Sequence, residues 1–233
     1  MMLMVNQINQ FYGGSHTLRS VSMSVQVGQC IAVMGRNGVG KTTLLQCLMG
    51  VQPIRDGSIE FNGQDISRLP PYQRARLGIA YVPQGREIFS RLTVEENILM
   101  GMANKTGPKA KHINPEIFEL FPILKTMINR RGGDLSGGQQ QQLAIARALV
   151  SEPKLIIFDE PTEGIQPSII KDIGRVIGIL RDQGNIAIVL CEQYFDFAQE
   201  LADTFIVLSR GEVVASGDQQ QMTDPSVRQL LSV

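Results

Sequence analysis

The sequence has no excess of charge of either sign, and this lack limits the partners it can attract. Its 233 residues carry 22 basic and 22 acidic side chains, so the formal net charge at pH 7 is zero. A protein drawn to nucleic acid or to an anionic membrane by its overall field needs a surplus of positive charge. We therefore expect no nucleic-acid partner and look for partners through local motifs.

Long hydrophobic runs are also missing. The longest unbroken apolar run, residues 186–191, is about a third of the roughly 20 residues needed to cross a bilayer. The methionine-rich start is interrupted by Asn6 and Gln7 and has no basic segment, unlike a secretory signal peptide. With 43% hydrophobic and 19% charged residues, the chain is typical of a soluble globular protein that is neither exported nor inserted in a membrane.

Cysteines are few and lack the spacing of a disulfide framework or a zinc site. Cys30, Cys47 and Cys191 are odd in number, and no two of them form a CxxC pair. This pattern is typical of reduced thiols in a cytosolic protein. Because free cysteine is often buried, we expect all three in the core.

What the sequence does contain is a strand and helix pattern typical of an α/β protein. Residues 21–27 alternate between apolar and polar side chains, and residues 57–63 repeat the alternation between two glycines. Both segments predict antiparallel strands near the N-terminus. Four short apolar runs predict strands covered on both faces of a mostly parallel sheet, namely residues 31–34, 155–158, 186–191 and 205–208.

Helix-start signals follow one another quickly in residues 86–150. Thr93 with Glu96, and Ser136 with Gln139, each match a capping box. We therefore expect a helical subdomain over these residues, inserted in an otherwise α/β chain.

The chain is predicted to be one domain over residues 1–233. Residues 1–85 and 151–233 form the α/β core with its antiparallel β subdomain, and residues 86–150 form the helical insert. Within the insert, Asn114–Pro115 matches a helix cap followed by proline at the first helical position. Three lysines nearby are expected in a solvated loop, namely Lys105, Lys109 and Lys111.

Residues 35–42 satisfy the GxxxxGK[ST] pattern of a phosphate-binding loop (P-loop). They follow the apolar run 31–34 and precede a predicted helix over residues 43–49, which is the context this motif requires. Glycines let successive N–H groups point inward, where the helix N-terminus adds partial positive charge. Lys41 is expected to reach the β and γ phosphates, and Thr42 to bind Mg²⁺. The candidate nucleotide-binding residues here are Gly35, Asn37, Gly38, Gly40, Lys41, Thr42 and Thr43.

Two carboxylates, Asp159 and Glu160, follow the apolar run 155–158. A carboxylate pair at the end of a buried strand is costly unless a cation or a proton-transfer role offsets the cost. Asp159 is therefore a candidate ligand of Mg²⁺, and Glu160 a candidate general base that polarises the attacking water.

A second anion-binding helix start is predicted at residues 135–139, Leu-Ser-Gly-Gly-Gln. A lone P-loop does not need this motif for its own phosphates. The P-loop, Gln84 after the predicted strand 79–82, this motif, and Asp159 with Glu160 occur in an order that resembles the ATP-binding cassette (ABC) family, whose signature is LSGGQ. The resemblance covers essentially the whole chain.

The resemblance implies a P-loop NTPase cassette with a mostly parallel, RecA-like core, which hydrolyses ATP with Mg²⁺. It also implies a second ABC ATPase subunit, because in that family the signature of one subunit closes over the nucleotide on the P-loop of another. Ser136, Gly138 and Gln139 match the residues that reach the nucleotide across the dimer. Gln84 matches the residue that senses Mg²⁺ and the γ-phosphate. Tyr12 matches the aromatic that stacks on adenine, with a core aromatic as the alternative.

Two positions depart from the family pattern. Gln193 stands at the switch position, which is usually histidine, and the only histidines, His16 and His112, lie elsewhere. An amide can hydrogen-bond a γ-phosphate or water, but it cannot titrate near neutral pH. We therefore expect Gln193 to take part in catalysis without acting as an acid. Gln166 replaces the usual aspartate of an inter-subunit loop, so that contact is not implied here.

Both departures are similar to one branch of the family, the ATPases of branched-chain amino acid and urea or amide importers. Residues 81–89 and 93–97 are also similar to this branch, while 35–43, 131–142 and 159–168 are most similar to its urea-import members. The resemblance implies uptake of urea or a related small amide, with branched-chain amino acids as the alternative.

The same resemblance implies a location at the cytoplasmic face of the membrane and docking on integral membrane permeases, with a solute-binding protein as an indirect partner. The permease contact is expected near Gln84 and residues 86–100, where Ile88, Phe89 and Leu92 are candidate apolar contacts. The alternative for these three is an ordinary core role.

Two other functions fit the sequence less well. An ABC ATPase for DNA repair or translation would carry a long coiled coil, or two cassettes with a charged linker, whereas this chain has one cassette, no heptads and no net charge. A small-molecule P-loop kinase would explain residues 35–42 but not residues 135–139.

Overall fold

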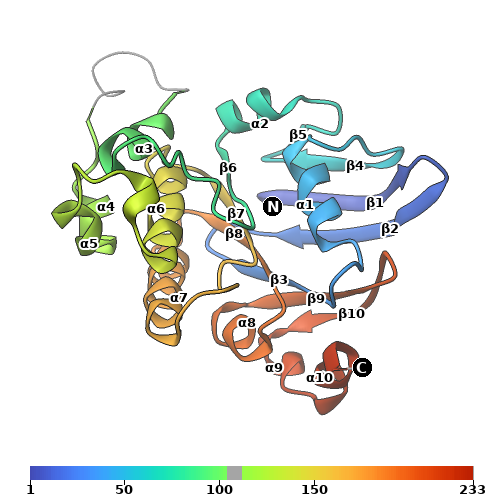
Figure 1. Ribbon diagram of the computed structural model, residues 1–233. Helices are drawn as coiled ribbons and strands as arrows, with labels where there is room; N and C mark the ends of the chain where they lie inside the picture. Colours follow the sequence, from blue (N-terminus) through green and yellow to red (C-terminus); the bar gives the residue numbers. More distant parts are fainter. Residues whose placement is uncertain (104–111, 233) are drawn as a thin grey trace.

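The chain forms two sheets and a group of helices, as seen in a computed structural model that describes residues 1–103 and 112–232 (Figure 1). The smaller sheet has strand order β2-β1-β4-β5, and the larger has order β10-β9-β3-β8-β7-β6. The predicted loop of Lys105, Lys109 and Lys111 lies outside the described residues.

The small sheet is antiparallel, as predicted. Its strands are β1 (Leu3–Tyr12), β2 (Ser15–Val25), β4 (Asp56–Phe61) and β5 (Gln64–Asp65). In β2 the apolar side chains of Val21, Met23 and Val25 are buried, while Ser22 and Ser24 between them are exposed. The alternation therefore places one face of the strand in the core.

The large sheet is parallel except at one edge. Its parallel strands are β3 (Cys30–Met34), β6 (Ile79–Val82), β7 (Leu155–Asp159), β8 (Ala187–Glu192) and β9 (Thr204–Ser209). β10 (Glu212–Asp218) pairs antiparallel with β9. The four predicted apolar runs form the buried strands β3, β7, β8 and β9, so the predicted α/β class with a mostly parallel core is confirmed.

Helices connect these strands and cover the large sheet. Outside residues 86–150 they are α1 (Lys41–Met49), α2 (Pro71–Leu77), α7 (Pro167–Asp182), α8 (Phe195–Leu201), α9 (Gln219–Met222) and α10 (Pro225–Ser232). The helix predicted at residues 43–49 begins two residues earlier, because it includes Lys41 and Thr42.

Residues 86–150 contain α3 (Val94–Met100), α4 (Glu116–Leu120), α5 (Pro122–Thr126), a 3₁₀ turn (Gly132–Asp134) and α6 (Gly137–Leu149). In Figure 1 they gather on the side of the large sheet away from the small sheet. The division into a core and a helical subdomain stays a prediction.

Both predicted capping boxes are confirmed. The Thr93 hydroxyl accepts from the Glu96 N–H at 3.1 Å, and the Ser136 hydroxyl accepts from the Gln139 N–H at 3.4 Å. The helix predicted to begin at Pro115 starts one residue later, at Glu116.

Three apolar clusters cover the two faces of the large sheet, and two of them are large. One contains side chains of α3 to α7, and the other joins the small sheet and α1 to the opposite face. Cys30, Cys47 and Cys191 are buried and unpaired, as predicted. Burial raises the pKa of Cys47 to about 12, so this thiol stays protonated and poorly reactive near neutral pH.

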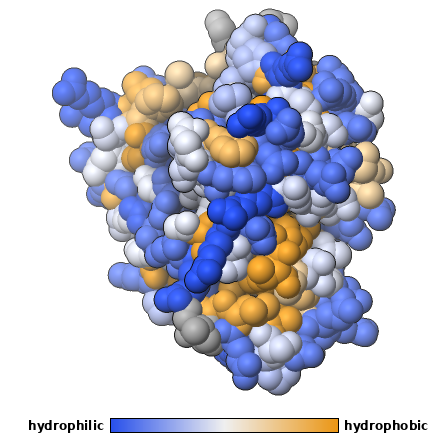
Figure 2. Space-filling view, turned by 90° about the vertical axis from the view of Figure 1, so that its right-hand side faces the viewer, coloured by the Kyte–Doolittle hydropathy of each residue, from blue (hydrophilic) through white to orange (hydrophobic). Residues whose placement is uncertain are grey.

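The face with the small sheet is mainly hydrophilic, and its largest group of apolar side chains lies in the lower half of Figure 2, with smaller groups in the upper half. Among the described residues, no helix combines the length and apolar character needed to cross a bilayer.

Candidate functional site

The P-loop joins the end of β3 to the start of α1. Gly35 has a φ of 147°, and a Cβ there would lie 2.5 Å from the backbone oxygen of Leu208. Gly38 has a φ of 79°, also in the region that favours glycine. Glycine is needed at these two positions because of their backbone conformation. This requirement accounts for the spacing of glycines in the motif.

The P-loop borders a cavity of about 260 Å³ that brings together residues from distant parts of the sequence. Its lining residues are Thr17, Asn37, Gly38, Gly40, Lys41, Thr42, Thr43, Gln84 and Glu160. Most of the predicted P-loop residues therefore share one cavity with Gln84 and Glu160. Thr17, on β2, was not predicted, because nothing in its own segment marks it.

Lys41 lies at the floor of this site and is only 4% exposed. Its Nζ donates to the backbone oxygens of Gly35 at 2.7 Å and Arg36 at 3.1 Å. It also forms an ion pair with Glu160, with an Nζ to Oε1 distance of 3.2 Å. An ammonium group has three donors, so all three have partners within the chain.

Glu160 follows β7 and has an unusual backbone. Its φ is 47°, a left-handed conformation that is uncommon for a residue other than glycine. Its N–H donates to the backbone oxygen of Cys191 at 2.9 Å, which ties it to β8. Strained backbone of this kind clusters at functional sites.

Asp159 is buried at the end of β7 with one oxygen unpaired. Its Oδ2 accepts from the Tyr81 hydroxyl at 2.8 Å, while Oδ1 is buried and has no hydrogen-bond partner among the described residues. Burial raises the pKa of Asp159, and the hydrogen bond from Tyr81 opposes that rise. Tyr81 was not predicted, since its link to Asp159 depends on the pairing of β6 with β7.

The residues present fit a Mg²⁺ ion. A buried carboxylate oxygen without a partner is costly unless a cation or donor meets it, and Oδ1 of Asp159 is such an atom. Mg²⁺ is usually bound by one or two carboxylates together with substrate phosphates and water.

Gln84 connects the segment after β6 to the carboxylates after β7. Its Nε2 donates to Oε2 of Glu163 at 2.8 Å and lies 3.4 Å from Oε2 of Glu160. The structure therefore brings Gln84 and Glu160 together, and it adds Glu163, which was not predicted.

Gln193 lies beside the P-loop. Its Nε2 donates to Oδ1 of Asn37 at 2.7 Å, across 156 residues of sequence. Gln193 does not line the 260 Å³ cavity, but it lines a neighbouring hollow with Gly35, Arg36 and Asn37. The predicted switch residue is thus within reach of the P-loop.

The signature motif lies at a different place. Ser136, Gly138 and Gln139 line a separate cavity of about 470 Å³ at the start of α6, which shares no lining residue with the P-loop cavity. Gln166 borders the same cavity. Each of the two predicted anion-binding motifs therefore faces its own cavity.

Tyr12 lies at the exposed end of β1, outside the lining of the P-loop cavity. It is 45% exposed, and its hydroxyl donates to Oε1 of Gln46 on α1 at 3.1 Å. It is not a core aromatic, and its stacking on adenine stays a prediction.

Arg147 of α6 holds the segment after Gln84, a contact that was not predicted. Its guanidinium donates to the backbone oxygens of Glu87 at 2.8 Å and Arg86 at 3.2 Å. It also lies 5.3 Å from the centre of the Phe89 ring, which is exposed. Ile88 packs partly into the core, so the predicted permease contacts differ in exposure.

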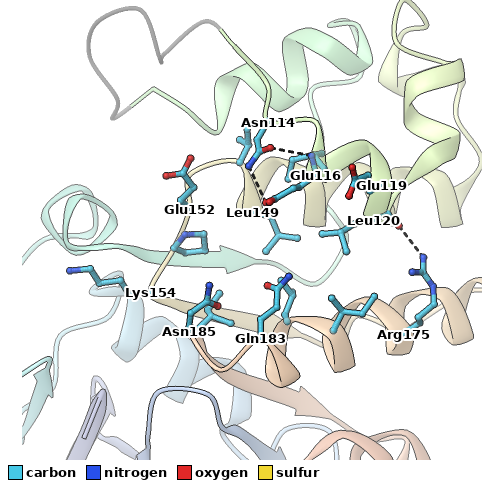
Figure 3. Close-up of a pocket in the computed structure, with 16 residues that line it drawn as sticks. Asn114, Glu116, Glu119, Leu120, Leu149, Glu152, Lys154, Arg175, Gln183 and Asn185 are labelled. Atoms are coloured by element: carbon cyan, nitrogen blue, oxygen red, sulfur yellow. Dashed lines mark hydrogen bonds between the residues drawn. The ribbon is translucent and has the colours of Figure 1, made fainter.

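A larger hollow of about 520 Å³ lies between α4 and α7 (Figure 3). Arg175 of α7 points across it and donates to the backbone oxygen of Leu120 at 3.1 Å. None of the predicted site residues lines this hollow. The candidate site is therefore identified by its chemistry and not by its size.

Comparison with known proteins gives a consistent family. A family model described as ABC transporter matches residues 18–163. The chain is 41% identical to the high-affinity branched-chain amino acid transport ATP-binding protein BraG of Pseudomonas aeruginosa, over 97% of each chain. It is 35% identical to the probable branched-chain amino acid transport ATP-binding protein LivF of Archaeoglobus fulgidus, over 96% of this chain and 94% of LivF.

Solved structures show the same fold. MJ1267, an ATP-binding cassette of an ABC transporter, matches with a TM-score of 0.83 at 28% identity, over 100% of this chain and 98% of that one. The dimeric structure of the cassette MJ0796 bound to ADP and Pi matches with a TM-score of 0.84 at 23% identity, over 94% of this chain and 99% of that one. At this lower identity, the second match concerns the fold alone.

Proposed function

The chain belongs to the ABC transporter family and is an ATPase, and on this premise we propose that it powers an importer of branched-chain amino acids. The observation that carries the proposal is the 260 Å³ cavity, where the P-loop, Gln84 and Glu160 meet. This arrangement combines a phosphate cradle, a buried cation and a carboxylate, which are the groups that phosphoryl transfer to water requires.

Binding of ATP would redirect Lys41. Its three donors have partners in the chain, so a contact with a phosphate requires that one partner be released. The Glu160 carboxylate is the partner whose release is useful. Once it is free of Lys41, it can accept a proton from the attacking water as general base.

Mg²⁺ would be held by Thr42, Gln84 and Asp159, and when bound it neutralises charge on the phosphate oxygens. Gln193, already beside Asn37, would donate its amide to the γ-phosphate or to the attacking water. Tyr12 would stack on the adenine from the end of β1.

The separate signature cavity supports a second subunit. Ser136 and the glycines after it offer an anion-binding helix start that the P-loop of the same chain does not share. We infer that they close over a nucleotide on a partner ABC ATPase. ATP then favours the closed pair through contacts that exist only in that state.

We propose that the permease contact lies at residues 86–100. Exposed Phe89 supplies an apolar surface there, and Arg147 links the segment to α6. Docking on integral membrane permeases at the cytoplasmic face, with a solute-binding protein delivering the solute, completes the proposed importer.

The solute is assigned from the relatives. The two relatives described above carry names for branched-chain amino acid transport and cover nearly the whole chain. Urea, the solute first expected, rests only on the three motif segments 35–43, 131–142 and 159–168. The comparisons therefore support branched-chain amino acids better than urea, which is kept as the second candidate.

Uptake of labelled solute tests the proposal. A strain that lacks this subunit should lose uptake of leucine and keep uptake of urea, and the wild-type subunit should restore it while Glu160→Gln should not. Loss of urea uptake alone would favour the second candidate. Normal uptake of both solutes would contradict an importer role for either.

A further inference from the structure

We propose that Glu192 is a positioning residue for ATP hydrolysis, because its buried carboxylate joins the turn that carries Glu160 to the turn that carries Gln193. This inference rests on the proposed function and adds a residue to it. Glu192 ends β8, the strand that lies between β3 and β7.

The Glu192 side chain receives donors from both turns. It is 2% exposed, and its Oε1 accepts from the Thr162 N–H at 3.1 Å. Its Oε2 accepts from the Gln193 N–H at 3.0 Å and from the Tyr194 N–H at 3.2 Å. Each carboxylate oxygen therefore holds a different turn.

The turn held by Oε1 contains the strained residue of the site. Glu160 keeps its left-handed φ of 47° only if its surroundings fix it. Two consecutive residues of β8 do so: the Cys191 backbone oxygen accepts the Glu160 N–H, and the Glu192 carboxylate accepts the Thr162 N–H. Loss of the second bond frees the turn directly after the proposed base.

The turn held by Oε2 carries the residue beside the P-loop. Gln193 places its amide on Asn37 at 2.7 Å, which requires a defined backbone at residue 193. Glu192 thus completes a series of hydrogen bonds that runs from the P-loop through Gln193 to the turn of Glu160. A shift of either turn moves a group that must meet ATP or water.

The charge of this carboxylate is costly for the fold. Within the described part of the chain, Glu192 forms no ion pair, and burial raises its pKa while its hydrogen bonds oppose the rise. A buried carboxylate without a cation is held only by its donors. A neutral side chain would be less costly to bury, so stability alone does not account for this group.

Glu192→Gln in the full chain, assayed with its transporter partners, tests the role. The amide keeps the shape but turns one acceptor into a donor that faces backbone N–H groups. We expect kcat to fall about 10- to 100-fold, as for a small misplacement of reacting groups. The affinity for ATP should change much less, since no contact with the nucleotide is proposed for Glu192.

A coupling measurement separates positioning from general stability. If Glu192 acts partly through Gln193, then Gln193→Ala should slow hydrolysis less in the Glu192→Gln protein than in the wild type. Asp203→Asn is the matched control, because the Asp203 carboxylate also accepts a backbone N–H, that of Cys30 at 2.8 Å. This contact lies at the start of β3, whereas the P-loop follows the end of β3. Asp203→Asn should lower the melting temperature and leave kcat unchanged.

A wild-type kcat in folded Glu192→Gln would overturn the proposal. So would a double variant, Glu192→Gln with Gln193→Ala, whose loss of kcat equals the product of the two single losses. If Glu192→Gln does not fold, Thr162→Val is the second variant, because it removes the hydroxyl that also hydrogen-bonds Glu192. Thr162→Val should also lower kcat. A wild-type kcat in Thr162→Val would therefore overturn the proposal as well. A separate measurement tests the proposed function. If Glu160→Gln still hydrolyses ATP at the wild-type rate, Glu160 is not the general base, whatever the result for Glu192.

Discussion

At the scale of single residues, charged side chains at the site already have hydrogen-bond or ion-pair partners within the chain. Lys41 has three partners, and Glu192 accepts from both turns beside it. Asp159 is the exception, with one buried oxygen unpaired. The proposed ATP hydrolysis therefore requires an exchange of partners at Lys41 and a new partner at Asp159.

Lys41→Ala should weaken ATP binding by about 2 to 5 kcal/mol, the usual loss for a desolvated charge contact. Titration of the purified full chain with a fluorescent ATP analogue measures the change. Lys154→Ala is the matched control, since Lys154 is an exposed cation on the distant 520 Å³ hollow. Equal ATP affinity in Lys41→Ala and wild type would remove Lys41 from the binding site.

At the scale of elements, two helices begin with the same kind of capping box but face different surroundings. Thr93 caps α3 and Ser136 caps α6, each through a complete capping box. The start of α3 pairs with residue 131 of the same region, whereas the start of α6 opens into the signature cavity. Only the second is placed to meet an anion from outside the chain.

Ser136→Ala and Thr93→Ala should each lower the free energy of unfolding by about 1 kcal/mol, because each removes a side-chain cap. Denaturant unfolding measures this loss. The two variants should differ in ATP hydrolysis by the purified ATPase subunits without the permease, which Ser136→Ala should slow and Thr93→Ala should leave near wild type. Equal rates in both variants would show that the Ser136 hydroxyl acts on the fold alone.

At the scale of the whole molecule, the two predicted anion-binding motifs face separate cavities, which is the basis for proposing that a second subunit completes the site. The three native thiols are buried, which leaves an introduced cysteine as the accessible one. The surface can therefore be probed without removing any native residue.

Ser136→Cys in a Glu160→Gln background should crosslink to the P-loop of a partner cassette when ATP is present. A photoactivatable reagent attached to the introduced thiol reacts with nearby C–H bonds, so it needs no amine in the P-loop. Mass spectrometry of the joined peptides then identifies the partner, whether it is a second copy or another subunit. Thr93→Cys is the matched control and should not join that peptide. Crosslinks from Ser136→Cys that never include a P-loop, although ATP binds, would contradict the shared site.

The sequence alone determined the elements and the motifs, because both depend on neighbouring residues. The alternation in 21–27, the apolar runs of the large sheet and the glycine spacing of 35–42 each follow from local backbone geometry. The helix starts at Thr93 and Ser136 followed for the same reason, since a cap and its partner are three residues apart.

Tertiary structure alone decided which side chains meet. Tyr81 reaches Asp159 across 78 residues, and Gln84 reaches Glu163 across 79. The strand order β3-β8-β7-β6 brings the carboxyl ends of these parallel strands to one edge, and no local pattern specifies that order. Glu192 was missed for this reason: its role lies in donors from two turns, and only the packed sheet places those turns side by side.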